Sequence, residues 1–263
     1  MPQRLIFCTY PSVYSDVVLD ELLRAEDIEV VGAVLSTRVL NKNYSHFYAS
    51  WRQIRRSGLR YAIYLFVITD LYRVLCRFFG KSTLRQRFKK RGIPVLETLD
   101  INDAEGLDFI TGLQADVMLS AHFNQLMGKG VLNLGNLSCL NIHPSLLPDY
   151  KGVDPAFYAM LRGEEETGVT VHFQEVEFDT GRIFEQKKWV IKEGDSLLGL
   201  NLKLFRRGVL VAVGRLSKLT SETTGKLQTE GGQYDSWPSP SSVFEFCRLR
   251  KLFRWKEVFN ALR

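Results

Sequence analysis

The 263 residues can bury a substantial core within one domain. Hydrophobic residues form 45% of the chain and charged residues 24%, which excludes disordered and collagen-like proteins. The four cysteines, Cys8, Cys76, Cys139 and Cys247, show no closely spaced pair of the kind that zinc sites use. We therefore expect no metal site, and free buried thiols in a reducing cytoplasm. The N-terminal apolar run is too short for a secretory signal.

Positive charge is concentrated in one part of the chain. Between residues 52 and 91 there are twelve Lys or Arg residues and a single acidic one, Asp70. This segment alone carries +11, against +6 for the whole chain, so the remainder is negative. The basic character therefore belongs to this segment and not to the fold as a whole.

Strand and helix patterns alternate along the rest of the chain. Buried strands are predicted at 5–9, 28–35, 93–96, 116–120 and 137–142, and two further strands at 168–176 and 183–191. Helices are predicted at 13–24, 103–112 (capped by Asn102 or Asp103), 155–163 and 196–219. This alternation predicts an α/β fold with an open, twisted, mostly parallel sheet and helices on both faces.

The most apolar part of the basic segment is 58–80. Its longest uncharged run, 61–69, has nine residues, whereas a membrane-spanning helix needs about twenty. Apolar residues at helical spacing instead predict an amphipathic helix. These residues are Ile63, Phe66, Val67, Leu71, Val74, Leu75 and Phe78.

Two nucleotide-binding motifs are missing. The first strand-to-helix turn, 8–12, lacks the glycines that bring a backbone close to a pyrophosphate, which argues against NAD. The chain also has no GxxxxGK[ST] loop for a nucleoside triphosphate.

The candidate catalytic residues lie at the end of the predicted strand 137–142. Asn141 and His143 lie two residues apart, so their side chains point to the same side of a strand. Ligands of open α/β sheets bind at the carboxyl ends of the strands. Two prolines and a glycine in the next nine residues predict an irregular loop, and a rigid loop holding a His beside an Asn suits charge stabilisation on a carbonyl oxygen.

This stretch resembles the folate-dependent formyltransferases, which include glycinamide ribonucleotide, methionyl-tRNA and sugar N-formyltransferases. The resemblance rests on three motifs in order: the run from Asn141 to Pro148 (NIHPSLLP), Gly-Val-Thr at 168–170, and Asp179-Thr180-Gly181. It covers 4–219 in strand order, with an expanded basic region at about 41–91. It implies a Rossmann-like catalytic unit at 1–220 with a basic helical insertion, followed by a short C-terminal extension at 221–263.

The resemblance implies that an amine attacks the formyl carbon of 10-formyltetrahydrofolate directly. Asn141 and His143 then donate hydrogen bonds to the resulting oxyanion. Asp179 orients the His143 ring, favours its protonated form and helps to remove the amine proton through water. Ser145 is not proposed as a nucleophile, because no base accompanies it.

Further residues of the chain match parts of the family that contact the folate. Backbone groups of Phe123, Gln125 and Leu126 are expected to contact the pterin, and His122 to be a wall or a functional residue. The loop 176–181 is expected to close over the pterin, which adds Val176, Phe178 and Gly181 to the folate-binding set.

The acceptor is left open by these motifs. The basic segment is suited to a phosphate-bearing acceptor such as a nucleotide-linked sugar, a phosphopantetheine carrier or tRNA. It is equally suited to a peripheral helix on anionic lipid, with Ile63, Phe66 and Leu71 in the apolar layer. A solvated charged face is the plain structural interpretation.

The C-terminal extension of about forty residues is too short for the barrel of tRNA-specific members, which weakens an initiator-tRNA role. It is expected to cap the catalytic unit or to build an acceptor wall. A methionyl-tRNA formyltransferase-like enzyme without that barrel, a formyltetrahydrofolate hydrolase and a folate-binding protein without turnover are the alternatives. The oligomeric state is not predicted.

Overall fold

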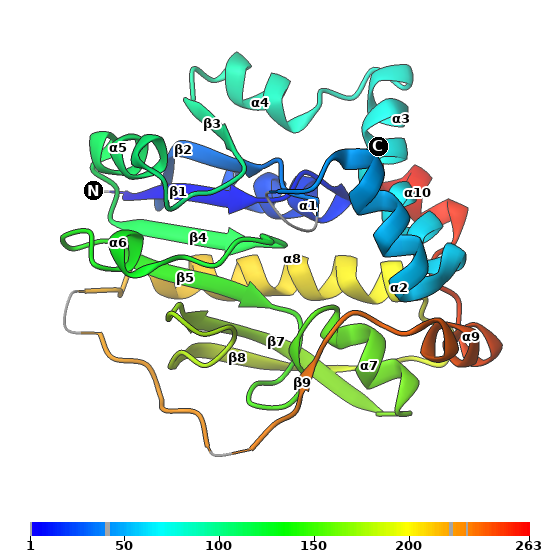
Figure 1. The fold of residues 1–263 in the computed structure, drawn as a ribbon. Coiled ribbons are helices and arrows are strands. Elements are labelled where there is room, and N and C mark those ends of the chain that lie inside the picture. Colours follow the sequence, from blue (N-terminus) through cyan, green and yellow to red (C-terminus); the bar gives the residue numbers. More distant parts are fainter. Residues whose placement is uncertain (1, 40–42, 221–222, 230) are drawn as a thin grey trace.

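A seven-stranded sheet forms the centre of the molecule in a computed structural model, which describes residues 2–39, 43–220, 223–229 and 231–263. The strand order across the sheet is β3-β2-β1-β4-β5-β7-β8 (Figure 1). The five strands from β3 to β5 are parallel, and β7 and β8 join antiparallel. Their bounds are β1 Gln3–Thr9, β2 Ile28–Ser36, β3 Val95–Thr98, β4 Val117–Ala121, β5 Ser138–His143, β7 Glu166–Phe173 and β8 Ile183–Val190. The predicted mostly parallel sheet is confirmed.

Both faces of the sheet are covered, because inner strands are apolar on alternate sides. In β1, Leu5 and Phe7 enter the larger core, while Ile6 and Cys8 enter the smaller one. The larger core lies under α1 (Val13–Leu22) and α8 (Leu197–Leu216). The smaller core lies under α5 (Ala104–Leu113) and α6 (Lys129–Leu132).

Side-chain caps define where the main helices begin. Ser12, Asp103 and Ser196 precede α1, α5 and α8, and each accepts a hydrogen bond from a backbone N–H of the first turn. Of the two predicted caps for α5, Asp103 is therefore the correct one. The helix predicted at 155–163 is α7, Pro155–Leu161.

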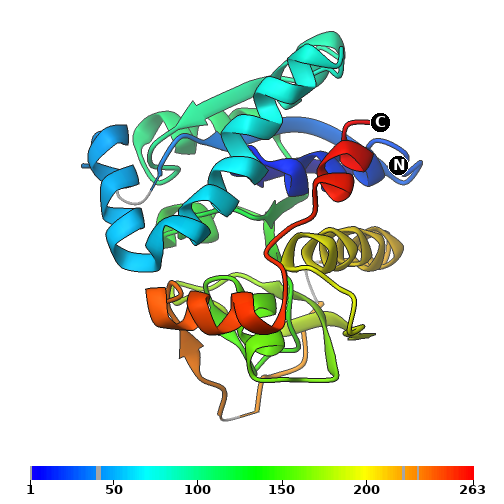
Figure 2. The ribbon, with the colours of Figure 1, turned by 90° about the vertical axis from the view of Figure 1, so that its right-hand side faces the viewer.

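The basic segment forms a helical insertion between β2 and β3. It consists of α2 (His46–Phe66, broken at Gly58), a π-helical turn η1 (Val67–Leu71), α3 (Tyr72–Phe78) and α4 (Leu84–Lys90). Figures 1 and 2 show α2 and α3 beside the carboxyl edge of the sheet. The predicted start of the insertion, Asn41, lies outside the described residues.

The predicted helix of the insertion is confirmed, but the face that packs on the protein is a different one. The buried residues between 58 and 80 are Tyr61, Tyr64, Val67, Ile68, Tyr72 and Cys76, of which only Val67 belongs to the predicted set. Most of the residues at the predicted spacing are exposed or only partly buried. The buried face is rich in tyrosine because hydroxyl groups pair there with other buried polar groups, which an apolar periodicity does not detect.

The C-terminal residues pack on α1, on α7 and on the insertion. Strand β9 (Tyr234–Asp235) pairs in parallel with β6 (Lys151–Gly152). Helices α9 (Pro240–Leu249) and α10 (Trp255–Ala261) follow, and Phe246 of α9 stacks on Phe157 of α7 at 4.6 Å. Figure 2 shows both helices on the same side as α2 and α3. Ser221, where the extension is predicted to begin, lies outside the described residues.

None of the helices in the described ranges is long and apolar enough to cross a membrane. The four cysteines are free thiols, buried at Cys8, Cys76 and Cys139 and half-buried at Cys247.

Candidate active site

Two of the predicted catalytic residues lie where β5 leaves the sheet. Asn141 pairs with His172 of β7, and His143 pairs with Thr170. The third, Asp179, comes from the loop between β7 and β8. Its Oδ1 atom lies 3.3 Å from Nδ1 of His143, and both side chains are nearly buried. The structure therefore brings the three residues together from the end of a strand and from a separate loop.

The second ring nitrogen of His143 faces a carbonyl group. Nε2 donates to the backbone oxygen of Tyr150 at 2.9 Å. A carbonyl oxygen only accepts, so Nε2 carries a hydrogen in this arrangement. The 144–150 loop that presents this carbonyl is held by Ser145, whose hydroxyl donates to Asp149 and Tyr150, and by Thr170, which donates to the Ser145 carbonyl.

Asp179 is held by the backbone around it. Its φ of 59° is in the left-handed region, and its Oδ2 atom accepts a hydrogen bond of 2.8 Å from the Gly152 amide. Gln228 donates to the carbonyls of Asp179 and Gly181. A side chain at Gly181 would collide with the carbonyl of Phe173. The glycine of the Asp-Thr-Gly motif thus lets the loop turn tightly against β7.

A chain of hydrogen bonds orients the Asn141 amide. Its Oδ1 atom accepts from the Ser120 hydroxyl at 2.7 Å, and its Nδ2 atom lies 3.1 Å from Nε2 of His172. Burial lowers the pKa of His172 to about 4, with the nearby His143 adding to the effect. Neutral His172 has its proton on Nδ1, which faces the Phe173 carbonyl, so its Nε2 accepts from Asn141. One hydrogen of the Asn141 amide is left for another acceptor.

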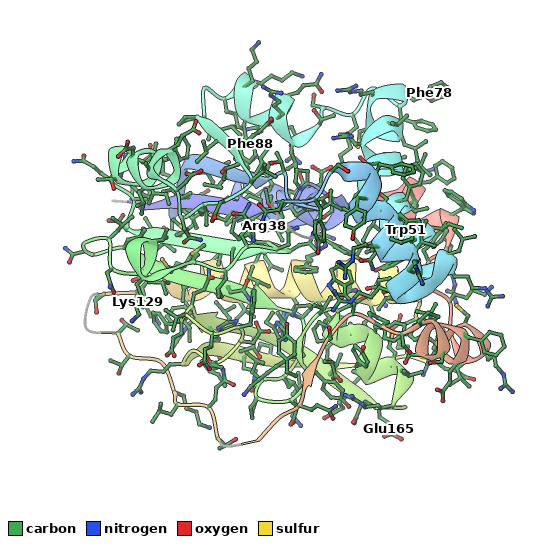
Figure 3. The ribbon with its side chains drawn as sticks, in the orientation of Figure 1. Arg38, Trp51, Phe78, Phe88, Lys129 and Glu165 are labelled. Atoms are coloured by element: carbon green, nitrogen blue, oxygen red, sulfur yellow. The ribbon has the colours of Figure 1, made fainter. Side chains whose placement is uncertain are left out.

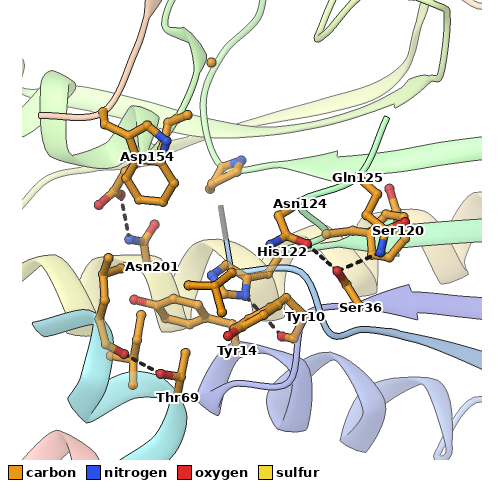
Figure 4. Close-up of a pocket in the computed structure, with 18 of the residues that line it drawn as sticks. Tyr10, Tyr14, Ser36, Thr69, Ser120, His122, Asn124, Gln125, Asp154 and Asn201 are labelled. Atoms are coloured by element: carbon orange, nitrogen blue, oxygen red, sulfur yellow. Dashed lines mark hydrogen bonds between the residues drawn. The ribbon is translucent and has the colours of Figure 1, made fainter. Parts of the chain in front are cut away.

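These residues line a pocket of about 1120 Å³ at the carboxyl edge of the sheet (Figure 4). Of the predicted folate contacts, Phe123, Gln125, Leu126 and Phe178 are among its lining residues, whereas Val176 and Gly181 are not. The Gln125 side chain is occupied, since it bonds to Ser36, to the Thr98 carbonyl and to the Ile101 amide. Only its backbone remains for the predicted contact.

His122 is part of the pocket wall. Its Nδ1 atom lies 3.0 Å from the Ser12 hydroxyl and 3.3 Å from the Tyr10 carbonyl. Burial lowers the pKa of His122 to about 4, so the ring is neutral at pH 7. Its ring packs edge-on against Tyr14.

A second polar cluster in the pocket was not predicted from the sequence. The carboxylate of Asp154 accepts from the Tyr61 hydroxyl at 2.7 Å and from the Asn201 amide at 3.2 Å (Figure 4). The hydroxyls of Tyr14 and Tyr64 form a hydrogen bond with each other beside this carboxylate. Burial raises the pKa of Asp154, and Oδ1 of Asn201 has no partner among the described residues. The only sequence signal was the Asp-Pro pair before α7, which is common at helix starts.

No group of His, Cys, Asp and Glu side chains in the described parts of the chain is arranged to hold a metal ion.

Comparison with known proteins places this chain in a family. A family model described as formyl transferase matches residues 75–210, more than half of the chain. Two curated relatives are methionyl-tRNA formyltransferases. That of Staphylococcus epidermidis is 33% identical over 138 residues, 52% of this chain and 44% of the relative. That of Bacillus licheniformis is 28% identical over 191 residues, 68% of this chain and 60% of the relative.

Solved structures share the fold. A sugar N-formyltransferase from a Shewanella species is 16% identical with a TM-score of 0.56, over 89% of this chain and 76% of the other. The phosphoribosylglycinamide formyltransferase of Bacillus halodurans is 21% identical with a TM-score of 0.56, over 84% of this chain and 96% of the other. An N-formyltransferase from Helicobacter canadensis, in complex with folinic acid and dTDP-3-aminofucose, is 17% identical with a TM-score of 0.54. The match covers 90% of this chain and 71% of the other.

The chain spans about half the length of the curated relatives it matches. The matched residues include Asn141, His143 and Asp179 and every strand from β3 to β8. The chain belongs to the formyl transferase family.

Proposed function

We propose that this protein transfers a formyl group from 10-formyltetrahydrofolate to an amine, with Asn141, His143 and Asp179 as its catalytic residues. The observation that carries the proposal is the hydrogen-bond chain from Ser120 through Asn141 to His172, beside the His143–Asp179 pair. It leaves one amide hydrogen of Asn141 in a pocket large enough for a folate-sized ligand.

Formyl transfer develops negative charge on the formyl oxygen, so a pre-oriented donor accelerates it. Asn141 is such a donor, because Ser120 and His172 prevent its amide from turning over. His143 is the second donor. In the transition state, the formyl oxygen takes the place of the Tyr150 carbonyl at Nε2, while Asp179 stays beside Nδ1. The Asp179 carboxylate orients the His143 ring and, through water, takes up the amine proton. This proton passes to N10 of tetrahydrofolate as the bond between N10 and the formyl carbon breaks.

The folate is proposed to lie against the end of β4. The 123–126 segment and Phe178 offer backbone and apolar surface there, as predicted for the pterin. The contacts predicted for Val176 and Gly181 require the 174–182 loop to close further over the ligand. We expect no metal to take part.

The acceptor amine is proposed to enter on the side of Asp154. This carboxylate has no cationic partner among the described residues, and the Asn201 carbonyl oxygen has no donor. Buried acceptors of this kind are satisfied by a ligand rich in N–H and O–H groups. An amino sugar or a similar hydroxylated amine fits this requirement better than an apolar amine does.

The test is turnover of 10-formyltetrahydrofolate with a panel of acceptors, measured as release of tetrahydrofolate. The panel contains amino-sugar nucleotides, glycinamide ribonucleotide, aminoacylated initiator tRNA and free amino acids. Transfer to one class and no turnover without amine supports the proposal. Equal turnover with and without amine identifies a hydrolase, and failure with every acceptor overturns the proposal.

A further inference from the structure

The helical insertion carries a second apolar face that the molecule itself does not cover. Its members recur at intervals of whole helical turns along α2 and α3, and their exposed fractions range from 46% to 82%. This exposed stripe consists of Leu59, Ile63, Phe66, Val74 and Phe78. Phe78, the most exposed of them, lies at the outer edge of the molecule (Figure 3).

The stripe is not the face by which the insertion packs. That role belongs to Tyr61, Tyr64 and Tyr72, whose hydroxyls bond to Asp154, Tyr14 and Asp16. A surface helix normally buries one apolar face and shows a polar one. Here the face away from the core is apolar as well, which indicates a partner that is itself apolar.

Aromatic residues of the C-terminal helix extend this surface. Phe78 contacts Phe79 at 5.4 Å between ring centroids, Phe79 contacts Phe259 at 6.0 Å, and Phe259 contacts Trp255 at 6.3 Å. Phe79, Trp255 and Phe259 are each 43–55% exposed. Phenylalanine and tryptophan are typical of the apolar face of helices that lie in the interface of a bilayer.

Basic side chains accompany the stripe on α2 and α3 and in the C-terminal residues. Several exposed ones form no ion pair with a described carboxylate: Arg55, Arg56, Arg60, Arg77, Lys256 and Arg263. The one acid of the segment, Asp70, is paired with Arg73 at 2.8 Å. An apolar stripe accompanied by cations without an ion-pair partner is complementary to anionic phospholipid. The acyl chains contact the stripe, and the headgroups bind the arginines.

We propose that this surface binds the protein peripherally to an anionic phospholipid bilayer. Nucleic acid would engage the arginines but would leave five large apolar side chains without a partner, so lipid fits the whole surface better. Leu59, Ile63 and Phe66 also line the catalytic pocket. Docking by the stripe therefore places the mouth of the pocket at the lipid surface.

The experiment is co-sedimentation of the full chain with two kinds of vesicle. One is phosphatidylcholine alone, and the other contains about 30% phosphatidylglycerol, an anionic lipid that attracts basic segments. We expect binding to the anionic vesicles only, weakened by 0.5 M salt. The double variant Val74→Ser/Phe78→Ser lies outside the pocket and should lower the partition coefficient roughly tenfold. Val190→Ser is the matched control, because Val74 and Val190 are each 57% exposed.

Replacing Arg55 and Arg77 by Gln should lower anionic binding by about fivefold for each charge. Two results overturn the proposal: no binding to either vesicle, or anionic binding that the Val74/Phe78 variant retains in full. Binding of an RNA duplex without vesicle binding would assign the surface to nucleic acid instead. None of these readouts uses turnover, so they stand apart from the formyltransferase proposal.

Discussion

At the residue scale, the three histidines that line the pocket differ in what holds them. His143 faces two oxygen acceptors, the Asp179 carboxylate and the Tyr150 carbonyl, which suits a ring that donates hydrogen bonds. Burial keeps His122 and His172 neutral and lowers their pKa values to about 4. Neutral His172 is what allows Asn141 to donate, so the donor geometry and the titration of His172 are linked.

This linkage predicts a loss of stability in mild acid. The unfolded chain protonates His172 near pH 6.5, whereas the folded chain resists protonation until about pH 4. Between these values the unfolded state binds more protons, so stability falls as the pH falls. At pH 5, the titration of His172 lowers the free energy of unfolding by about 2 kcal/mol relative to pH 8. Urea unfolding of wild type and His172→Gln at both pH values measures it. An identical pH dependence in the two proteins would refute the assignment.

Asp154 is a residue-scale test of the acceptor side. Asp154→Asn keeps the shape and one carbonyl oxygen but removes the charge from the cluster with Tyr61 and Asn201. We expect the KM for the acceptor amine to rise roughly tenfold, while the Kd for folinic acid stays the same. Initial rates against acceptor concentration give the first value, and fluorescence titration gives the second. An unchanged KM would place the acceptor elsewhere in the pocket.

At the element scale, the short pairing of β6 with β9 supports the loop that carries Asp179. Gly152 of β6 has a φ of 100°, and its amide donates to Asp179. A side chain there would collide with the Asp235 carbonyl of β9. The pairing thus lets the C-terminal residues influence the position of the Asp179 carboxylate, which we propose to be catalytic.

Gly152→Ala should therefore cost more than about 2 kcal/mol of unfolding free energy and lower turnover together with it. The matched control is Gly214→Ala, since Gly214 lies in α8 with open space around it and no positive φ. That variant should gain up to about 1 kcal/mol. Denaturant unfolding of both proteins decides the matter, and equal stabilities would show that the β6–β9 contact is not tightly packed.

The elements that the sequence predicts well are those whose pattern is local. Apolar runs mark the strands and helices, and one cap is predicted, at Asn102 or Asp103. The ends of the predicted elements shift by only a few residues. The Asn141–His143–Asp179 cluster follows from motifs. His172, Asp154 and Asn201 were missed because antiparallel pairing of β5 with β7 and packing of α7 on α8 bring them together. The apolar spacing in 58–80 predicts one face of the helix only. The buried face consists largely of tyrosines, which an apolar pattern does not detect.

At the scale of the whole molecule, the C-terminal helices are packed into the same core as the sheet. Phe246 is fully buried on Phe157, and Tyr72 and Lys81 of the insertion both donate to the Ala261 carbonyl. The division into a catalytic unit at 1–220 and an extension at 221–263 remains a prediction. These contacts favour a single cooperative structure.

Phe246→Ala should lower the unfolding free energy by about 3–5 kcal/mol while unfolding remains one transition. Phe244→Ala, in the same helix but 58% exposed, should change it by less than about 0.5 kcal/mol. Thermal unfolding followed by circular dichroism and by tryptophan fluorescence tests this. Two separate transitions in the wild type would mean that the extension is an independent unit.

The measurement that bears most directly on the central proposal compares His143→Ala with wild type in two assays on the same preparations. One is tetrahydrofolate release from 10-formyltetrahydrofolate with an accepted amine, and the other is the Kd for folinic acid. We predict that the rate falls by at least about a hundredfold while the Kd changes less than about threefold. A variant that keeps its rate, or that loses folate binding altogether, would contradict the role given to His143.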